Sequence, residues 1–229
     1  MHPHSPPVAD SAVPRLSTRD LRSFTAEAEK KVLIALARRL PRWIGPDHLT
    51  ALGVLSMAGA GLCYRLLVVS PLALLGVNFF LFLNWFGDSL DGTLARVRER
   101  QRPRYGFYVD HLVDAFGAIF LLGGLASSGL AAPFSALALL TAYLLLQIHI
   151  ALKAHTTRVF QIAFGGVGGT EARILVGTLN LGLLIWPGFQ AMVTPLCWLV
   201  AAVLVSLVVA DGVRTGRALD LEERSLWKD

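Results

Sequence analysis

The sequence is poor in cysteine and lacks a stretch with the features of a cleavable leader. Its two cysteines, Cys63 and Cys197, both lie within apolar runs, so we expect them to pack in the interior rather than to form a disulfide or a metal-binding pair. Residues 1–18 are polar and proline-rich and have no apolar centre, which argues against a secretory signal peptide. The net charge is +5, yet no basic and aromatic groove pattern accompanies it, so nucleic acid is not an expected partner.

Long apolar runs are what the sequence has in abundance. Hydrophobic residues make up 54% of the chain and the mean hydropathy is +0.57, whereas a soluble domain has about 45–50% apolar residues. A helix needs about 20 residues to cross the hydrocarbon core of a membrane. Because only Ser70 and Pro71 separate the first two runs, a single broken helix is an alternative there. The pattern predicts an all-α, polytopic membrane protein with six transmembrane helices, over residues 49–70, 71–88, 105–128, 133–152, 173–189 and 191–210.

The basic residues are distributed unevenly between these runs. Of the 21 Lys and Arg residues, only Arg65 falls on the side that the chain reaches after odd-numbered spans. The breaks near 127–133 and 187–194 carry no charge, whereas the other breaks and the C-terminal tail are basic. Because short basic loops stay on the cytoplasmic side, we expect both termini in the cytoplasm and the chain in the inner membrane of a cell. We interpret four arginines of the second loop as topology and lipid-headgroup charges, namely Arg98, Arg100, Arg102 and Arg104.

The stretch before the first span has apolar residues at helical spacing, among them Val32 and Leu36, and Arg, Lys and Glu fill much of the rest. This pattern is typical of a helix that lies in the membrane interface, although it is nearly as consistent with a simple connector helix. Pro41 is expected to end the helix. The expected organisation is a disordered tail (1–18), a juxtamembrane amphipathic helix (19–45), a membrane domain (46–212) and a cytoplasmic tail (213–229).

Four aspartates flank the basic loop between the second and third predicted spans. Asp88 and Asp91 are three residues apart at the end of the second span, so they share a helix face. Asp110 and Asp114 are four residues apart at the start of the third span, and they share a face with Gly106. Because the two helices are antiparallel neighbours, we expect the four carboxylates to meet near the cytoplasmic boundary of the membrane.

Ionisable side chains at membrane depth are costly and usually mark a functional site. Oxygen ligands suit hard cations such as Mg²⁺ or Mn²⁺, and no Cys or His lies at a matching helical position. Two such ions could bridge phosphate oxygens and orient an attacking oxygen. The alternative is a set of interhelical hydrogen bonds, for which one or two aspartates would suffice. The predicted metal ligands are Asp88, Asp91, Asp110 and Asp114.

The aspartates belong to a longer pattern, Asp88-x-x-Asp91-Gly92-x-x-Ala95-Arg96 followed by Gly106-x-x-x-Asp110-x-x-x-Asp114. This pattern resembles the signature of the CDP-alcohol phosphotransferase family, also called the CDP-alcohol phosphatidyltransferase family. The loop between its two halves is one residue longer than usual. The segment 46–50 (PDHLT) is similar to the Pro-Asn-x-Leu-Thr that opens the first span in many members, with Asp47 in place of Asn. The similarity covers about residues 20–211.

The resemblance implies an enzyme that transfers a phosphatidyl or another substituted phosphate group from a CDP-linked donor to an alcohol, with release of CMP, in phospholipid biosynthesis. It also implies a homodimer. Asp114 would be the catalytic base for the acceptor hydroxyl as well as a metal ligand; a hydroxyl is a poor nucleophile at neutral pH, so a positioned base is needed. The CDP portion would be bound by Thr50, Asp91, Gly92, Arg96 and Gly106.

A second polar group lies around the end of the fourth run and the start of the fifth. The segment 168–173 (GGTEAR) resembles a Gly-x-Thr-Glu-x-Arg stretch of some family members, which indicates an acceptor pocket. We therefore predict that Lys153, Arg158 and Arg173 bind the acceptor. The alternative is that these cations set the topology beside a helix that Thr170 caps.

The sequence leaves the two substrates open. CDP-diacylglycerol is the common donor in members of this length, and the acceptor could be a polyol, a polyol phosphate or serine; these substrates and the membrane lipids are the expected partners. His111 after Asp110 resembles the Asp-His-x-x-Asp of aminoalcohol phosphotransferases, in which diacylglycerol accepts from CDP-choline or CDP-ethanolamine, and this is the second interpretation. A CDP-lipid hydrolase would need only water. A divalent-cation transporter would need polar groups along a path, yet the outer halves of the spans are almost wholly apolar.

Overall fold

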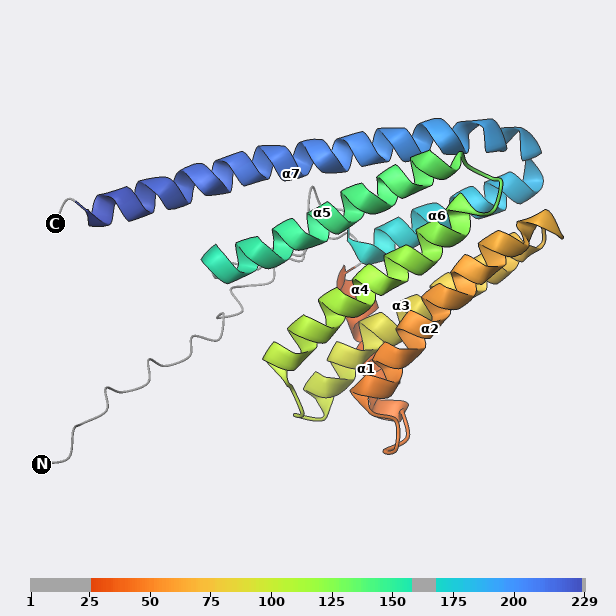
Figure 1. Ribbon diagram of the computed structural model, residues 1–229. Helices are drawn as coiled ribbons and strands as arrows, with labels where there is room; N and C mark the ends of the chain where they lie inside the picture. Colours follow the sequence, from red (N-terminus) through yellow and green to blue (C-terminus); the bar gives the residue numbers. More distant parts are fainter. Residues whose placement is uncertain (1–25, 158–167, 228–229) are drawn as a thin grey trace, which may run out of the picture.

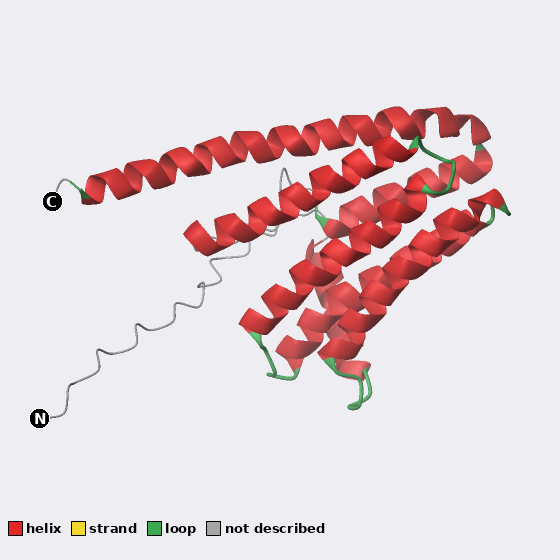
Figure 2. Ribbon diagram, in the orientation of Figure 1, coloured by secondary structure: helices red, strands yellow, loops and turns green. Residues whose placement is uncertain are grey.

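The computed structural model describes residues 26–157 and 168–227. Every regular element in this part of the chain is a helix (Figures 1 and 2). The predicted all-α class is therefore confirmed. The helices are α1 (Ala26–Arg39), α2 (Pro46–Arg65), α3 (Ala73–Val97), α4 (Pro103–Ala126), α5 (Pro133–Thr157), α6 (Gly169–Ile185) and α7 (Gln190–Leu226), with two short 3-10 helices, η1 (Leu66–Val68) and η2 (Pro187–Phe189).

The described helices that are long and apolar enough to cross a membrane number five, one fewer than predicted. The exception is α6, which has 17 residues; at about 1.5 Å of rise per residue it is shorter than a hydrocarbon core of about 30 Å. It ends early because the backbone of Trp186 leaves the helical region and a proline follows. The chain is an integral membrane protein. The five candidate spans are Pro46–Val68, Ala73–Val97, Pro103–Ala126, Pro133–Thr157 and Pro187–Ser225.

Two helices, and not one broken helix, occupy the first two apolar runs. α2 ends at Arg65, η1 follows, and α3 begins at Ala73 and packs along α2. The alternative of a single broken span is therefore wrong.

The helices form two groups, one around α2 and α3 and the other made of α5 and α7. α2, α3 and α4 lie side by side, and α1 and α6 both pack on α3. α5 packs on α4, and α7 packs on α5 and extends beyond its end (Figure 1). The α5–α7 pair is joined to the rest of the molecule by the contact between α4 and α5 and by η2, which packs on both α6 and α7.

Glycines bring the backbone of α2 into direct contact with the backbones of α3 and α4. A Cβ atom at Gly61 would lie 2.1 Å from the carbonyl oxygen of Phe120 on α4, and one at Gly124 would lie 2.2 Å from the carbonyl oxygen of Gly61. A Cβ atom at Gly87 on α3 would lie 2.5 Å from the carbonyl oxygen of Leu49 on α2. Only glycine permits such an approach, so these three helices are held at close and fixed separations.

The N-terminal helix packs on the end of α3 that carries the aspartates. Leu33 and Ala37 of α1 are buried in a cluster with Leu90 and Leu94 of α3. Val32, which the sequence pattern placed with the apolar face, is 51% exposed. The predicted helix begins at Ala26 in the described part of the chain, and residues 19–25 lie outside it.

Two arginines of the loop after α3 make contacts within the protein. The guanidinium of Arg98 donates hydrogen bonds to the backbone carbonyls of Leu40, Pro41 and Ile44, in the loop between α1 and α2. Arg102 forms an ion pair with Asp47 at the start of α2. Both arginines therefore tie the α3–α4 loop to the entry of α2, a structural role that the sequence interpretation did not include; their role as topology charges stays a prediction.

Candidate active site

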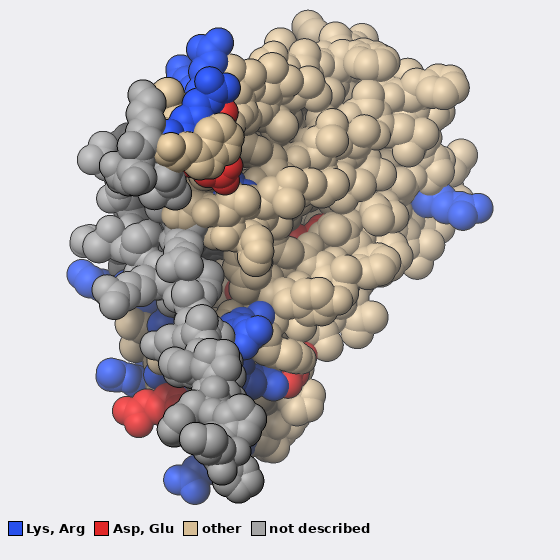
Figure 3. Space-filling view, turned by 60° about the vertical axis from the view of Figure 1, so that its left-hand side comes forward, with Lys and Arg blue, Asp and Glu red and all other residues tan. Residues whose placement is uncertain are grey.

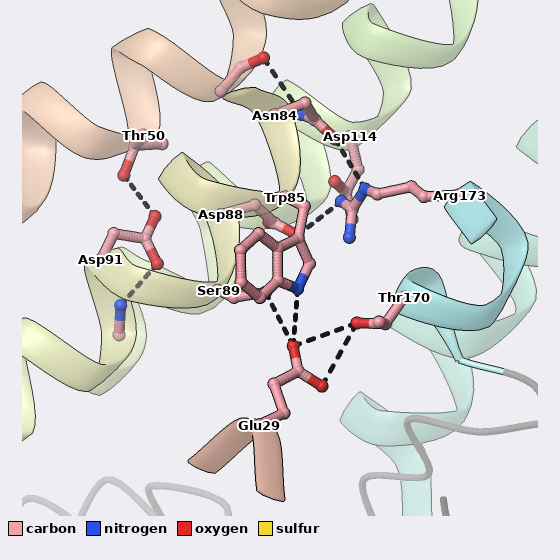
Figure 4. A network of polar contacts seen from close by, with 12 residues as sticks. Glu29, Thr50, Asn84, Trp85, Asp88, Ser89, Asp91, Asp114, Thr170 and Arg173 are labelled. Atoms are coloured by element: carbon pink, nitrogen blue, oxygen red, sulfur yellow. Dashed lines mark hydrogen bonds and ion pairs between the residues drawn. The ribbon is translucent and has the colours of Figure 1, made fainter. Parts of the chain in front are cut away.

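The end of α3 presents Asp91 towards α2. Leu90 and Leu94 face α1 and are fully buried, which turns the other side of this helix towards its neighbours. The hydroxyl of Thr50, on α2, donates to Asp91 Oδ2 at 2.6 Å, and the backbone N–H of Gly92 donates to the other oxygen of the same carboxylate. The first-span threonine singled out in the sequence therefore contacts the second aspartate of the signature (Figure 4).

One turn earlier on α3, Asp88 meets a cation from α6 (Figure 4). Arg173 Nη2 donates to Asp88 Oδ2 at 2.6 Å, and Arg173 Nε donates to Asn84 Oδ1 at 2.7 Å. The amide of Asn84 is in turn oriented by the carbonyl of Gly53 on α2, to which it donates at 3.0 Å. Gly169 leaves room for the guanidinium, since a Cβ atom there would lie 3.1 Å from Arg173 Nη1. Two donors of one guanidinium are thus fixed by two acceptors of one helix face.

The aspartates of α4 lie in different surroundings. Asp114 is half-buried and accepts a hydrogen bond of 3.4 Å from Gln147 Nε2 on α5. The same amide donates to the hydroxyl of Tyr143, one turn earlier on α5, at 3.1 Å. Asp110 lies one turn before Asp114 and is exposed. Asp114 is therefore held by a side chain of α5, whereas Asp110 is exposed.

These side chains line a cavity of about 210 Å³ that has a polar end and an apolar end. The polar residues come from α2, α3, α4, α5 and α6, and the apolar residues continue the cavity towards the middle of the helices. A cavity of this size and lining can take the part of a ligand in which a charged group joins an apolar one. The polar lining consists of Thr50, Asn84, Asp88, Asp91, Asp114, Tyr143 and Arg173, and the apolar lining includes Val54, Met57, Leu81, Leu121, Leu122 and Val176.

The carboxylates are suited in kind to a hard cation but are not gathered around one point. Asp88, Asp91 and Asp114 line the cavity, and its described lining contains no His or Cys, so the donor set is one of oxygens. Within residues 26–157 and 168–227, no three His, Cys, Asp or Glu side chains are close enough to form a metal-binding group. Two of the carboxylates are instead engaged by Arg173 and Thr50. The donor chemistry fits Mg²⁺ or Mn²⁺. In this structure, however, hydrogen-bond donors of the protein occupy the positions around Asp88 and Asp91 that a metal ion would take.

The two glycines of the signature have no steric role within the protein. A Cβ atom at Gly106 would meet nothing within 4 Å, and one at Gly92 would approach only Arg96 Nη1, at 3.8 Å. Arg96 Nη2 donates to the hydroxyl of Thr93 at 3.0 Å. Space beside both glycines is therefore open, as close approach of a ligand to the backbone requires.

The structure separates the three cations that the sequence grouped as an acceptor pocket. Arg173 lines the cavity. Lys153 lines a different hollow, between α5 and α7, and its Nζ lies 2.7 Å from Asp211 Oδ2. His149 Nε2 lies 2.8 Å from the same oxygen. Arg158 lies outside the described residues. The prediction that Lys153 and Arg173 line one pocket is therefore wrong, because the two side chains line different hollows.

Several residues of the site were missed in the sequence. Asn84, Tyr143 and Gln147 were passed over as parts of apolar runs, although a polar side chain inside such a run, one turn from another polar residue, is a usable signal. Thr170 is not a helix cap: the N-cap of α6 is Gly168, whose N–H donates to Glu171 Oε2 at 3.0 Å. Thr170 instead contacts Glu29 of α1.

An all-helical membrane protein with a pair of aspartates on each of two consecutive helices, α3 and α4, and a cavity lined by three of them is the class that fold and site define. The sequence model of the CDP-alcohol phosphatidyltransferase family matches residues 43–209. The chain belongs to this family, whose members are transferases of substituted phosphate groups and are generally dependent on a divalent cation. It therefore acts in phosphatidyl transfer from a CDP-alcohol in phospholipid synthesis. No match was found among curated proteins.

Proposed function

We propose that the enzyme transfers phosphatidyl from CDP-diacylglycerol to a small polar alcohol and releases CMP. The observation that carries this proposal is the two-ended cavity. Its polar end holds three signature aspartates and Arg173, and its other end is lined by apolar side chains inside the membrane-spanning helices. A diphosphate with two acyl chains needs both ends, whereas a soluble CDP-alcohol would need only the first.

The residues of the polar end divide the reaction between them. Asp114 takes the proton of the acceptor hydroxyl, and Gln147 on α5 holds its carboxylate. The oxygen so freed attacks the β-phosphorus of the donor. The bond from that phosphorus to the oxygen bridging to the α-phosphate breaks, and CMP leaves with the electron pair. The CDP portion is held by Thr50, Asp91, Gly92, Arg96 and Gly106.

Divalent cations are part of this proposal, because the donor chemistry of the cavity fits them. The residues that would hold two Mg²⁺ or Mn²⁺ ions are Asp88, Asp91, Asp110 and Asp114. When bound, such ions neutralise charge on the phosphate oxygens. Asp88 and Asp91 would then exchange Arg173 and Thr50 for the cation as partners.

The acceptor contact is assigned to Arg173 alone. Its guanidinium is 19% exposed and lies in the cavity beside Asp88, where a phosphorylated or otherwise anionic acceptor could pair with it. Lys153 is left out because it faces α7. His111, the feature that favoured an aminoalcohol substrate, is not part of the cavity lining; its Nδ1 lies 2.8 Å from the carbonyl oxygen of Phe107.

The proposed topology keeps six membrane crossings, with α6 as a short crossing and with both termini in the cytoplasm of the cell, at its inner membrane. Two observations support it. α6 packs on α3 among the longer spans, and on the face drawn in Figure 3 most of the basic and acidic surface gathers towards one side while the remainder is almost free of charge. The interfacial placement of α1, the membrane domain over residues 46–212 and a homodimer remain predictions.

The test is transfer by the purified protein from labelled CDP-diacylglycerol to a panel of acceptors: glycerol 3-phosphate, serine, inositol and inositol phosphate. We expect product with one of them, loss of product on chelation, and recovery with Mg²⁺ or Mn²⁺. CMP release without any alcohol would indicate hydrolysis, and transfer only from CDP-choline or CDP-ethanolamine to diacylglycerol would indicate the aminoalcohol reaction. Full activity in excess chelator would remove the metal from the proposal.

A further inference from the structure

One carboxylate of the N-terminal helix joins three helices. Glu29 Oε1, on α1, lies 2.8 Å from Trp85 Nε1 and 3.3 Å from Ser89 Oγ, both on α3. The same oxygen lies 3.1 Å from Thr170 Oγ1 on α6 (Figure 4). Glu29 lies before the segment that the family model matches, residues 43–209. A residue outside the family segment is thus bound to two helices that carry the candidate active site.

The partners of Glu29 flank the polar end of the cavity. Ser89 directly follows Asp88, and Thr170 lies three residues before Arg173 on the same helix. Arg173 itself contacts Asp88 at 2.6 Å, which closes a ring of contacts from α1 through α6 to α3. Because residues three apart in a helix are neighbours on its surface, a shift of the first turn of α6 moves Arg173 with it.

The first turn of α6 depends on this contact more than the rest of the helix does. Farther along, Asn180 Nδ2 donates to Asn78 Oδ1 on α3 at 2.8 Å, and Asn78 Nδ2 donates to the carbonyl of Gly177 at 3.0 Å. The distal half of α6 therefore has its own polar anchor on α3. At the N-terminal end, the contacts of α6 with α3 run through Arg173 and, by way of Glu29, through Thr170.

We propose that Glu29 is a positioning residue for the transfer reaction: it holds the first turn of α6 against α3 and so fixes the guanidinium of Arg173 in the cavity. The inference rests on the proposed function in one respect, that Arg173 contacts a substrate. Oε1 accepts from Trp85, Ser89 and Thr170, and Oε2 accepts only a second, longer contact of 3.4 Å from Thr170. The required property is therefore a hydrogen-bond acceptor at the position of Oε1 and not a negative charge. An amide keeps that oxygen, and alanine does not.

The first experiment compares Glu29→Gln, Glu29→Ala and Lys30→Ala, the last being an exposed residue of the same helix. Steady-state transfer with CDP-diacylglycerol should show kcat/KM for the acceptor about 10-fold lower in Glu29→Ala, with most of the change in the KM. The kcat/KM of Glu29→Gln should stay within about threefold of the wild-type value, and the kcat/KM of Lys30→Ala should equal the wild-type value. Equal losses in the Gln and Ala variants would overturn the inference, because the charge would then be what matters.

A double-mutant cycle tests whether Glu29 acts through Arg173. In an Arg173→Ala background, Glu29→Ala should lower kcat/KM by less than about twofold, since the group that it positions is absent. A general loss of folded protein would give the same factor in both backgrounds, and that result would count against positioning. The cycle uses the full-length chain in detergent or in vesicles.

Hydrogen–deuterium exchange gives a measurement that needs no turnover. The amides of residues 169–173 should exchange faster in Glu29→Ala than in wild type, with no change in Lys30→Ala. Unchanged exchange in Glu29→Ala would refute the holding of α6 whatever the activity. Absence of transfer by the wild-type protein would instead refute the proposed substrates, and the exchange comparison would still decide the role of Glu29.

Discussion

Arg173 and Lys153 each meet a carboxylate of another helix at nearly the same distance, yet the two ion pairs differ in what surrounds them. Arg173 Nη2 lies 2.6 Å from Asp88 and Lys153 Nζ lies 2.7 Å from Asp211. The two basic side chains are similarly shielded, at 19% and 16% exposure. The first pair lines the cavity among signature residues, whereas the second joins α5 to α7, with Asp211 beyond the family segment 43–209.

The comparison shows that charge, burial and helix position do not by themselves mark a substrate contact. Asp211 accepts from both His149 and Lys153, two residues of the same face of α5, and so links two helices. Asp88 shares its cation with Asn84 beside an open cavity, so a ligand can reach the pair. The first pair is expected to act in the reaction and the second in stability.

The sharpest way to break this comparison is to neutralise each carboxylate in turn. Asp88→Asn should lower turnover on the order of 100-fold, because it removes charge from the proposed cation site and strands Arg173. Asp211→Asn should leave turnover within about twofold and lower the free energy of unfolding by about 1 kcal/mol. Transfer assays and thermal unfolding in detergent measure the two effects. The reverse pattern, with Asp211→Asn inactive and Asp88→Asn active, would exchange the roles assigned to the two pairs.

Removing the cations is the second test. Arg173→Ala should raise the KM for the acceptor about 10-fold or more, since a charge-assisted hydrogen bond contributes about 1.5–3 kcal/mol, and should change the KM for the CDP-linked donor much less. Lys153→Ala should leave both constants within about twofold. Initial rates over a matrix of donor and acceptor concentrations give the four values. An acceptor KM unaffected by Arg173→Ala would place the acceptor elsewhere in the cavity.

A smaller effect is expected when an arginine is replaced by lysine, which keeps the positive charge but not the planar guanidinium group. Arg96→Lys should reduce kcat/KM for the donor about 10-fold, because a guanidinium can grip phosphate oxygens in two places and an ammonium cannot. Arg100→Lys, an exposed change in the loop that follows α3, should be silent. Initial rates over a range of donor concentrations measure kcat/KM for both variants. Equal losses in the two variants would contradict the assignment of Arg96 to the donor site.

The smallest effect on activity is expected at Arg98, which belongs to neither pair. Its guanidinium donates to backbone carbonyls between residues 40 and 44, so Arg98→Ala should lower the free energy of unfolding by about 1–2 kcal/mol. Turnover per folded molecule should remain near that of wild type. Turnover normalised by active-site titration, compared with unfolding curves, separates the effect on activity from the effect on stability. A large loss of turnover with unchanged stability would make Arg98 part of the active site.

Much of this arrangement could be predicted from local spacing. The signature aspartates fall on helix faces because positions three and four apart always do, and Thr50 was singled out by its segment before it proved to contact Asp91. The fifth apolar run, 173–189, has the same length as α6 but lies four residues too far along the chain, because an apolar run does not reveal that the helix begins at Gly169 and ends before Trp186 and Pro187. The partners of charged residues could not be predicted, since Lys153 with Asp211 is a contact between segments 58 residues apart.

The same limit explains Glu29 and Gln147. Each is a polar residue whose neighbours along the chain give no sign of its partner, because the partner lies on a helix placed by the packing of the whole bundle. Arg98 was assigned to the membrane surface for the same reason, since its carbonyl acceptors belong to a loop more than 50 residues away.

The glycine contacts of α2 with α3 and α4 bear on which walls of the cavity are fixed. Backbones that already touch at Gly61, Gly124 and Gly87 cannot part without losing that packing along the whole seam, so this side of the cavity behaves as a fixed wall. α6, by contrast, contacts α3 through side chains, both polar and apolar, among them Arg173, Asn180 and Val176. The wall of the cavity that α6 forms is therefore the one on which backbone contact places the least constraint.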